Sequence, residues 1–233
     1  MLKIIREDVQ TVFARDPAGR SLLDVLFCYP ALHALLLHRV ASFLWRHRVH
    51  LPARLLSHVN RFLTGVEIHP GAKIGKGFFL DHGTGVVIGE TAEIGDDVLM
   101  YQGVVLGGTS LEKRKHHPTI ENNVVLGAAA ILLGPVTVGE GARVGANSVV
   151  VKSVPPSATI VGVPGRIVED RRPAIVDLEH GKLPDPVNEA IGLMLEKQGA
   201  LEDRVEHLER LLKGNSRVKH SSSESQVRDG NER

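Results

Sequence analysis

Aliphatic residues return every six positions through the middle of the chain, with small or β-branched residues four positions after most of them. A period of six fits neither the 3.6-residue turn of an α-helix nor the two-residue alternation of a strand. It is typical of a hexapeptide parallel β-helix, in which each hexad forms one flat side of a triangular coil and points its aliphatic side chain inward. We therefore predict such a fold over residues 65–168. The aliphatic positions are Ile68, Ile74, Leu80, Ile88, Ile94, Met100, Leu106, Ile120, Leu126, Leu132, Val138, Val144 and Val150.

The period breaks in two places. Between Leu80 and Ile88 the step is eight residues, and the excess lies in Asp81-His82-Gly83-Thr84-Gly85. Between Leu106 and Ile120 the step is fourteen, and the excess forms a loop that ends in His116-His117-Pro118. A regular β-helix wall needs extra residues only where something must project from it. These two breaks are therefore the candidate functional segments.

Residues 1–64 are predicted to be helical. Asp16-Pro17 should end the first helix, because the residue before a proline disfavours the α region. Pro30 can begin the next helix, and a third should cover about residues 52–63. The stretch 22–45 is the most apolar part of the chain, but charged residues and a proline interrupt it. We predict a buried helical segment there and no membrane span.

The C-terminal part has a second period, of alternating four and three residues. It predicts a heptad helix over residues 186–213, which either packs on its own β-helix or self-associates as a coiled coil. Residues 169–185 are predicted to be a linker and residues 214–233, which are polar and charged, a disordered tail. The seam positions are Val187, Ile191, Met194, Gln198, Leu201, Val205, Leu208 and Leu212.

Composition narrows the classes of function. The 28 Lys and Arg residues against 27 Asp and Glu give a formal net charge of +1, which does not favour a nucleic-acid surface. Cys28 is the single cysteine, so an intrachain disulfide is excluded, as expected in a reducing compartment. The first residues lack the apolar core of a secretory signal. We expect a cytoplasmic protein without nucleic-acid or membrane partners.

His82 is the strongest candidate for chemistry, because it stands at the first break between Asp81 and Gly83. A neutral histidine is the natural general base near pH 7, and it needs an orienting carboxylate. Glu67 lies fifteen residues earlier. Since a regular coil takes about eighteen residues, Glu67 should lie roughly one coil below and reach the ring. The alternative for a lone histidine is a surface or buried imidazole with no catalytic role.

The second break has glycines at its start, in Gly107-Gly108-Thr109, and His116 and His117 at its end. Adjacent glycines let a ligand lie close to the backbone amides. The two histidines either bind an anionic group or form a solvated pair beside the basic stretch 113–115. Metal binding is a further alternative, but the histidines lack compact ligand spacing and no cysteine joins them, so we expect no metal.

Several segments of the chain resemble serine O-acetyltransferases. The resemblance covers about residues 5–168, and its Asp-His-Gly and Gly-Glu-Thr-Ala segments are more specific than the repeat. It implies that the parallel β-helix is left-handed. The predicted fold is thus a left-handed parallel β-helix, preceded by the small α-helical domain and followed by the C-terminal helix. It also implies a homotrimer, or a dimer of trimers, with active sites between neighbouring β-helices. The segments are Glu67–Gly75, Leu80–Ala92, Gly107-Gly108-Thr109, His117-Pro118 and Gly162-Val163-Pro164-Gly165-Arg166.

The resemblance implies a reaction as well. The histidine matching His82 removes the proton from the hydroxyl of L-serine, which attacks the acetyl-CoA thioester and gives O-acetyl-L-serine for cysteine biosynthesis. The acid matching Glu67 orients that histidine. The positions implied for substrate binding are Asp16, Asp81, Gly108, His116 and His117. The positions implied for acetyl-CoA are Gly107, Gly108, Thr109, Ala128, Arg143 and Ala146.

Three features depart from the family pattern. Many relatives have Asp in place of Glu67. Many have Arg in place of His116, and Arg binds a carboxylate bidentately and stays charged. Long-form enzymes dock a C-terminal Ile into O-acetylserine sulfhydrylase, whereas this chain ends in Arg233. We therefore expect no stable complex with the sulfhydrylase.

Two other functions are compatible with the repeat. A related hexapeptide O-acetyltransferase would act on a sugar or another small hydroxyl acceptor, but the acids Asp16 and Asp81 suit an ammonium group. A non-catalytic trimeric scaffold would have no use for His82 and its carboxylates. Serine O-acetyltransferase is the leading hypothesis.

Overall fold

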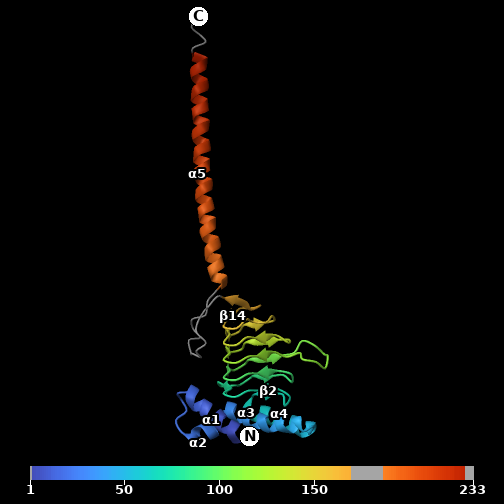
Figure 1. Ribbon diagram of the computed structural model, residues 1–233. Helices are drawn as coiled ribbons and strands as arrows, with labels where there is room; N and C mark the ends of the chain where they lie inside the picture. Colours follow the sequence, from blue (N-terminus) through green and yellow to red (C-terminus); the bar gives the residue numbers. More distant parts are fainter. Residues whose placement is uncertain (1, 169–185, 229–233) are drawn as a thin grey trace. The chain divides into compact units, whose positions relative to one another are not determined.

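The computed structural model describes residues 2–168 and 186–228, which belong to two compact units, residues 1–184 and 185–233 (Figure 1). The predicted linker 169–185 lies outside the described residues. The first unit contains helices and then short strands, and the second contains one helix. The N-terminal helices are α1 (Leu2–Arg15), α2 (Leu22–Cys28), α3 (Pro30–Arg46) and α4 (His50–Thr64).

The helix boundaries follow from local sequence. The first helix ends before Asp16-Pro17 and the third begins at Pro30, as predicted. The sequence reasoning missed α2 as a separate helix. Ser21 begins it, since its side-chain oxygen accepts a hydrogen bond from the Asp24 backbone N–H at 3.1 Å. Ser-x-x-Asp is a recognisable helix-start pattern and could have revealed this helix. Gly65, with φ of +71°, ends α4 in the left-handed conformation that glycine adopts freely.

The strands are two or three residues long and form three sheets. From β1 to β13, strands three apart along the chain pair in parallel register, whereas β14 pairs with β12 and β15. Sheet A has the order β1-β4-β7-β10-β13, sheet B β11-β8-β5-β2 and sheet C β15-β14-β12-β9-β6-β3, in which only β15 is antiparallel among the described strands. The strands are β1 (Glu67–Ile68), β2 (Lys73–Ile74), β3 (Phe79–Leu80), β4 (Val87–Ile88), β5 (Glu93–Ile94), β6 (Leu99–Met100), β7 (Val105–Gly107), β8 (Thr119–Ile120), β9 (Val125–Leu126), β10 (Ile131–Leu133), β11 (Thr137–Val138), β12 (Arg143–Val144), β13 (Val149–Val150), β14 (Thr159–Val161) and β15 (Arg166–Val168).

The predicted aliphatic positions stack in columns inside the three sheets. All of them are buried except Ile74, which is half-buried and packs against the same core. Burying each such side chain stabilises the fold by about 1.5–3 kcal/mol relative to leaving it exposed. The hexad prediction is therefore confirmed. In sheet A the column consists of Ile68, Ile88, Leu106, Leu132 and Val150.

The two breaks in the period are bulges at corners of the stack. A regular coil takes eighteen residues, from Ile88 to Leu106, whereas the coil from Ile68 takes twenty. The coil from Leu106 to Leu132 takes twenty-six. The strands on both sides of each bulge stay in register. The extra residues therefore leave the wall intact and stand out from it.

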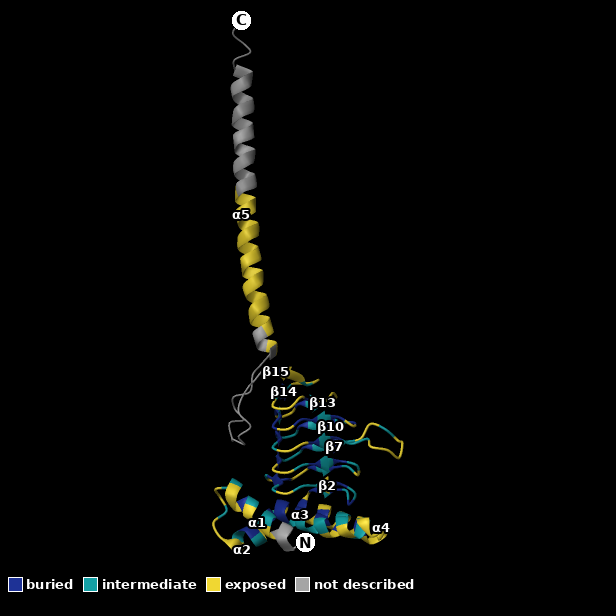
Figure 2. Ribbon diagram, viewed as in Figure 1, coloured by how far each residue is buried: buried dark blue, intermediate teal, exposed yellow. Residues whose placement is uncertain are grey.

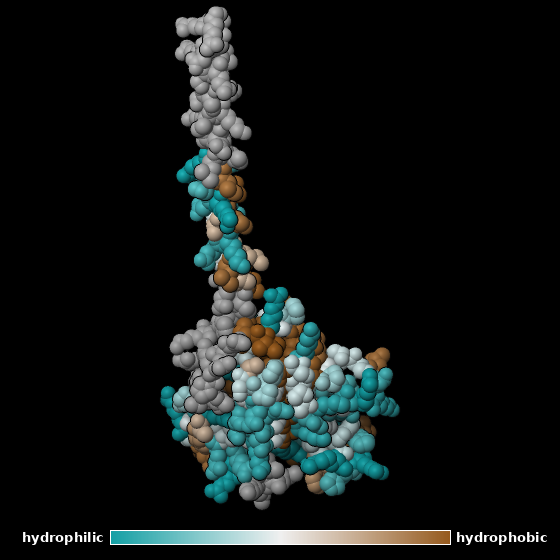
Figure 3. Space-filling model, turned by 45° about the horizontal axis from the view of Figure 1, so that its top comes forward, coloured by the Kyte–Doolittle hydropathy of each residue, from teal (hydrophilic) through white to brown (hydrophobic). Residues whose placement is uncertain are grey.

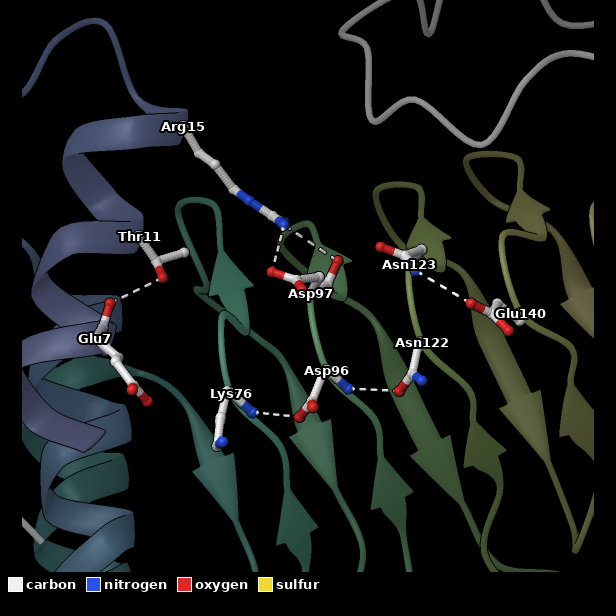
Figure 4. A network of polar contacts seen from close by, with 9 residues as sticks. All are labelled: Glu7, Thr11, Arg15, Lys76, Asp96, Asp97, Asn122, Asn123 and Glu140. Carbon is white, nitrogen blue, oxygen red and sulfur yellow. Dashed lines mark hydrogen bonds and ion pairs between the residues drawn. The ribbon is translucent and has the colours of Figure 1, made fainter. Parts of the chain in front are cut away.

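A polar ladder runs along the corner between sheets B and C (Figure 4). The Lys76 backbone N–H donates to the Asp96 carboxylate at 2.7 Å, and the Asp96 N–H donates to the Asn122 side-chain oxygen at 2.9 Å. Arg15 joins α1 to this ladder through Asp97, at 3.3 Å. The side chains thereby satisfy backbone donors that the tight corners leave unpaired.

The helices pack on the first coil (Figure 2). Ala34 and Leu35 of α3 are buried in the same cluster as Val66 and Ile68. We predicted a buried helical segment over residues 22–45, and this prediction is confirmed for the part that belongs to α3. Among the described residues no single helix is long and apolar enough to cross a membrane. Only α2 and α3 together reach that length and apolarity, with a bend of 71° between them.

The second unit consists of α5 (Pro186–Arg228). This helix continues past residue 213, where the sequence predicted its end, and residues 214–228 are helical where disorder was predicted. That stretch contains no proline and only Gly214 as a strong helix breaker, so nothing in it forces the helix to stop.

Candidate active site

The corner between β3 and β4 projects His82 from the wall. His82 has φ of +59°, a left-handed conformation, and its side chain is 75% exposed. Gly83 follows with φ of +79°, and a Cβ there would lie 3.0 Å from Leu80 and 3.2 Å from Val66. This position therefore requires glycine for both its backbone and its space.

A cavity of about 450 Å³ lies beside this corner and collects three of the predicted residues. Asp16 comes from the α1–α2 connection, whereas Asp81 and His82 come from the β3–β4 corner. The His82 Nε2 lies 3.8 Å from an Asp81 carboxylate oxygen. Asp24 of α2 lines the cavity too, and no Lys or Arg is among its lining residues. Three carboxylates without a basic residue suit a cationic group such as an ammonium.

Tyr29 holds Asp16 in place and was missed by the sequence reasoning. Its hydroxyl donates to one Asp16 carboxylate oxygen at 2.8 Å, while the Ala18 backbone N–H donates to the other at 2.7 Å. Burial, and then this hydrogen bond, raise the pKa of Tyr29 to about 12, so the hydroxyl stays a donor at neutral pH. A tyrosine just before Pro30 gave no signal of this role in the sequence.

The Glu67 carboxylate forms its ion pair with Arg61 and not with His82. Its carboxylate lies 3.0 Å from the Arg61 guanidinium of α4, and both side chains are substantially exposed. Because this coil takes twenty residues, Glu67 is opposite Val87, and His82 stands in the corner five residues before that level. The orienting role of Glu67 therefore stays a prediction.

The corner between β7 and β8 carries the other two predicted histidines, and Thr91 fixes them. The Thr91 hydroxyl accepts hydrogen bonds from the backbone N–H groups of His116 and His117, each at 3.1 Å. The Thr91 backbone N–H donates to His117 Nδ1 at 3.2 Å. An acceptor role for Nδ1 assigns the proton of the neutral ring to Nε2. Thr91 belongs to the Gly-Glu-Thr-Ala segment, but the sequence gave it no role.

His117 is held neutral and faces glycine backbone. Burial, and then the charge of His116, lower its pKa. A Cβ at Gly89 would collide with the His117 ring, and a Cβ at Gly108 would lie 2.5 Å from the His116 ring. The glycines therefore make room for both imidazoles. His117 Nε2–H becomes a neutral donor suited to an anionic oxygen.

The two corners lie on opposite edges of sheet A. The β3–β4 corner precedes a strand of sheet A, whereas the β7–β8 corner follows one, and the 108–118 loop stands out from the stack (Figure 1). A six-residue side spans about 20 Å at 3.3 Å per residue. One chain therefore presents His82 and His117 on separate edges.

Apart from Arg143, the residues predicted for acetyl-CoA divide between the same two edges. Gly107 ends β7, and the Gly134 N–H donates to its carbonyl at 3.0 Å. Thr109 packs against Gly134. Ala128 and Ala146 lie at the corner between sheets C and A, and Arg143 begins β12 on sheet C.

No group of three or more His, Cys, Asp or Glu side chains among the described residues is placed to hold a metal ion.

Comparisons with known proteins agree on one family. Residues 117–152 match the bacterial transferase hexapeptide (six repeats) family model. A serine acetyltransferase of Synechococcus elongatus is 50% identical over 89% of this chain and 85% of its own length. A serine acetyltransferase of Bacillus subtilis is 49% identical over 88% of this chain and 97% of its own length.

Solved structures lead to the same family. Serine acetyltransferase of Neisseria gonorrhoeae, in complex with serine, superposes with a TM-score of 0.69 at 40% identity, over 72% of this chain and 68% of that one. A serine acetyltransferase in complex with cysteine gives a TM-score of 0.70 at 42% identity, over 72% of this chain and 69% of that one.

Proposed function

Since the chain belongs to the serine acetyltransferase family, we propose that it transfers the acetyl group of acetyl-CoA to the hydroxyl of L-serine. The products are O-acetyl-L-serine and CoA, and the reaction serves cysteine biosynthesis. The observation that carries the proposal is the acidic cavity in which Asp16, Asp81 and His82 meet. The structural similarity to a serine acetyltransferase solved in complex with serine supports serine as the molecule that binds in this cavity.

Asp16 and Asp81 bind the serine ammonium in this proposal. Both carboxylates line the cavity, and Tyr29 and Ala18 hold Asp16 by donating to its two oxygens. A charged donor between carboxylates makes charge-assisted hydrogen bonds, which are shorter and stronger than neutral ones. Such anchoring fixes the serine hydroxyl beside His82, so that proton transfer and attack begin from an aligned geometry.

His82 acts as general base. The imidazole takes the hydroxyl proton while the serine oxygen attacks the thioester carbonyl. The tetrahedral intermediate collapses as the C–S bond breaks, and the leaving CoA sulfur takes the proton back from the imidazolium. Glu67 is proposed to orient His82 once its carboxylate turns from Arg61, and an exposed ion pair of this kind is weak enough to exchange.

The complete site lies between two chains. We propose a left-handed coil assembled as a homotrimer or a dimer of trimers, in which the β7–β8 corner of one subunit meets the β3–β4 corner of the next. The separation of the two corners on sheet A supports this arrangement. His117 then donates from Nε2 to the serine carboxylate, and His116 lies beside it, with the two ring centres 4.3 Å apart.

Acetyl-CoA is proposed to lie in the groove between the same two edges. Gly107, Gly108 and Thr109 line one side, and Ala128 and Ala146 line the other, with Arg143 toward the nucleotide end. Glycine and alanine suit this position because a pantetheine arm must approach the backbone closely. We also propose a cytoplasmic location, in keeping with the single cysteine.

The test is CoA thiol release from acetyl-CoA, measured with L-serine, L-homoserine and simple sugars as acceptors. We expect the highest kcat/KM with L-serine. Homoserine, with one extra methylene, should be about 10–200-fold poorer. A sugar that matches or exceeds L-serine would replace the proposal with the alternative hydroxyl acetyltransferase.

A further inference from the structure

The helix α5 carries an exposed apolar stripe. On the part whose side chains are described, the stripe residues are between 49% (Ile191) and 70% (Met194) exposed. Figure 3 shows hydrophobic side chains along one side of this helix and hydrophilic ones along the other. Leu193 and Leu195 are also exposed and lie outside the stripe, on the N-terminal part of α5. A stripe that continues over several turns with this regular spacing indicates a partner surface. Its members are Val187, Ile191, Met194, Leu201, Val205 and Leu208.

We propose that α5 forms a parallel, in-register coiled coil with the α5 helices of other copies of this chain. The spacing of four and three places Ile191, Gln198 and Val205 at heptad position a. Val187, Met194, Leu201 and Leu208 then occupy position d. β-Branched residues at a and leucine at d are characteristic of parallel coiled coils. This inference concerns assembly and is independent of the acetyl-transfer chemistry.

The charges beside the seam select the parallel orientation. Lys197 and Arg204 occupy position g, and Glu202 and Glu209 occupy position e. In a parallel pair, g of one helix faces e of the next heptad on the other. Lys197 therefore meets Glu202 of the partner subunit, and Arg204 meets Glu209 of the partner subunit. An antiparallel pair would place g against g and e against e, so like charges would face each other.

Gln198 favours the same register. In the single helix its amide donates to Glu202 at 2.9 Å. A polar residue at one a position lowers stability, but it penalises shifted pairings that would bury it against apolar side chains. In-register pairing places the Gln198 side chains of all copies in one layer, where they can hydrogen-bond to each other.

The competing occupant is the apolar surface of the first unit. Val151, Val163 and Ile167 are between 49% and 72% exposed and could receive such a stripe. That surface would not require basic residues on one flank of the stripe and acidic residues on the other. The charge pattern is instead what a second identical helix needs. Parallel pairing also agrees with a rotationally symmetric oligomer, whose subunits all extend α5 in the same direction.

Cysteine cross-linking of the full-length chain tests the proposal. In a Cys28→Ser background, Leu208→Cys places a thiol at position d and Arg210→Cys places one at the outward position f. Parallel, in-register helices bring the two d thiols within disulfide reach, where Cα atoms are about 4.4–6.8 Å apart. Antiparallel helices would separate them by about 30 Å at 1.5 Å per residue. We expect Leu208→Cys to cross-link at least about 10-fold faster than Arg210→Cys under mild oxidation. Equal rates would overturn the proposal.

Reversing the charges beside the seam tests whether cross-linking depends on the proposed pairs between positions g and e, or only on the helices being close together. Adding Lys197→Glu and Arg204→Glu to the Leu208→Cys chain should slow cross-linking severalfold at low salt. Adding Glu202→Lys and Glu209→Lys as well should restore it, because the g–e pairs are then complementary again. Cross-linking that ignores both changes would contradict the pairing. Because Cys28 lines the proposed active-site cavity, the acetyl-transfer rate of each variant is compared with that of the Cys28→Ser chain. The α5 substitutions should leave that rate unchanged, so cross-linking that contradicts the coiled coil would not bear on the proposed function.

Discussion

At the scale of single residues, Asp16 and Asp81 show how much of the cavity depends on distant parts of the chain. Asp16 is held by Tyr29, and Asp81 sits on the corner that also carries His82. His82 could be found from the sequence, because it breaks a strict period. Asp16 was found only through the family resemblance. Tyr29 and Thr91 were missed, because a hydrogen bond to a residue thirteen or more positions away leaves no local pattern.

His82→Ala should lower kcat/KM for L-serine by about 10²–10⁴-fold, the usual contribution of a general base. The far-UV circular dichroism should not change, because the side chain is exposed. Glu67→Gln should cost less, since it removes the charge but keeps a hydrogen-bonding group. His58→Ala, at an exposed position of α4, is the matched control and should keep full activity. A folded His82→Ala enzyme with near-normal turnover would show that His82 is not the general base.

His38 makes stability depend on pH. It is buried, and burial followed by the Arg39 charge lowers its pKa to about 3, below the value of about 6.5 in an unfolded chain. Between these values the unfolded state binds the extra proton. The free energy of unfolding should therefore fall as pH drops from 6.5, by up to about 1.4 kcal/mol per pH unit. Denaturant titrations at pH 7 and pH 5 measure this.

His38→Gln should reduce that pH dependence, because no imidazole remains at the position. The exposed His58→Gln should leave it unchanged. His69, whose pKa is lowered to about 4, chiefly by burial, should maintain part of the slope in both variants. An unaltered slope in His38→Gln would show that other groups account for the acid sensitivity.

At the scale of elements, strands were easier to predict than helices. Each hexad strand is fixed by an aliphatic residue that must stack on its neighbours, so the period alone places it. The helices have weaker boundaries: α2 is separated from α3 only by Tyr29, and α5 runs on because nothing stops it. The sequence showed which residues are inserted at the two corners, because they break the six-residue period. The hydrogen bonds that these residues form could not be predicted from it.

Thr91→Val should loosen the 108–118 loop. The substitution keeps the shape of the side chain but removes the hydroxyl that accepts from His116 and His117. At about 0.5–1.5 kcal/mol per hydrogen bond, we expect the KM for L-serine to rise roughly 3–10-fold, with a smaller change in kcat. Hydrogen exchange of the loop amides should accelerate. Thr137→Val, on β11, is the control and should alter neither quantity.

At the scale of the whole molecule, the separation of the two corners leads to a prediction: if the proposed site lies between subunits, an isolated chain should be inactive. Truncation after Val168 should leave an oligomer that is still active but dissociates at a higher concentration than the full chain, because it lacks α5. Light scattering during dilution, combined with activity at each concentration, tests this. An active monomer would contradict the site between subunits.

The strands of sheet A stay in register across the second bulge, and this has a consequence for which changes of sequence a β-helix tolerates. Leu106 and Leu132 stay opposite each other although twenty-six residues separate them. An insertion at a corner therefore costs mainly loop-closure entropy, about 0.6 kcal/mol for each doubling of loop length. Neighbouring coils need not repack. During evolution, the residues of a corner can thus be lengthened, shortened or replaced almost independently of the stacked core. The substrate specificity can change in this way while the β-helix keeps its structure.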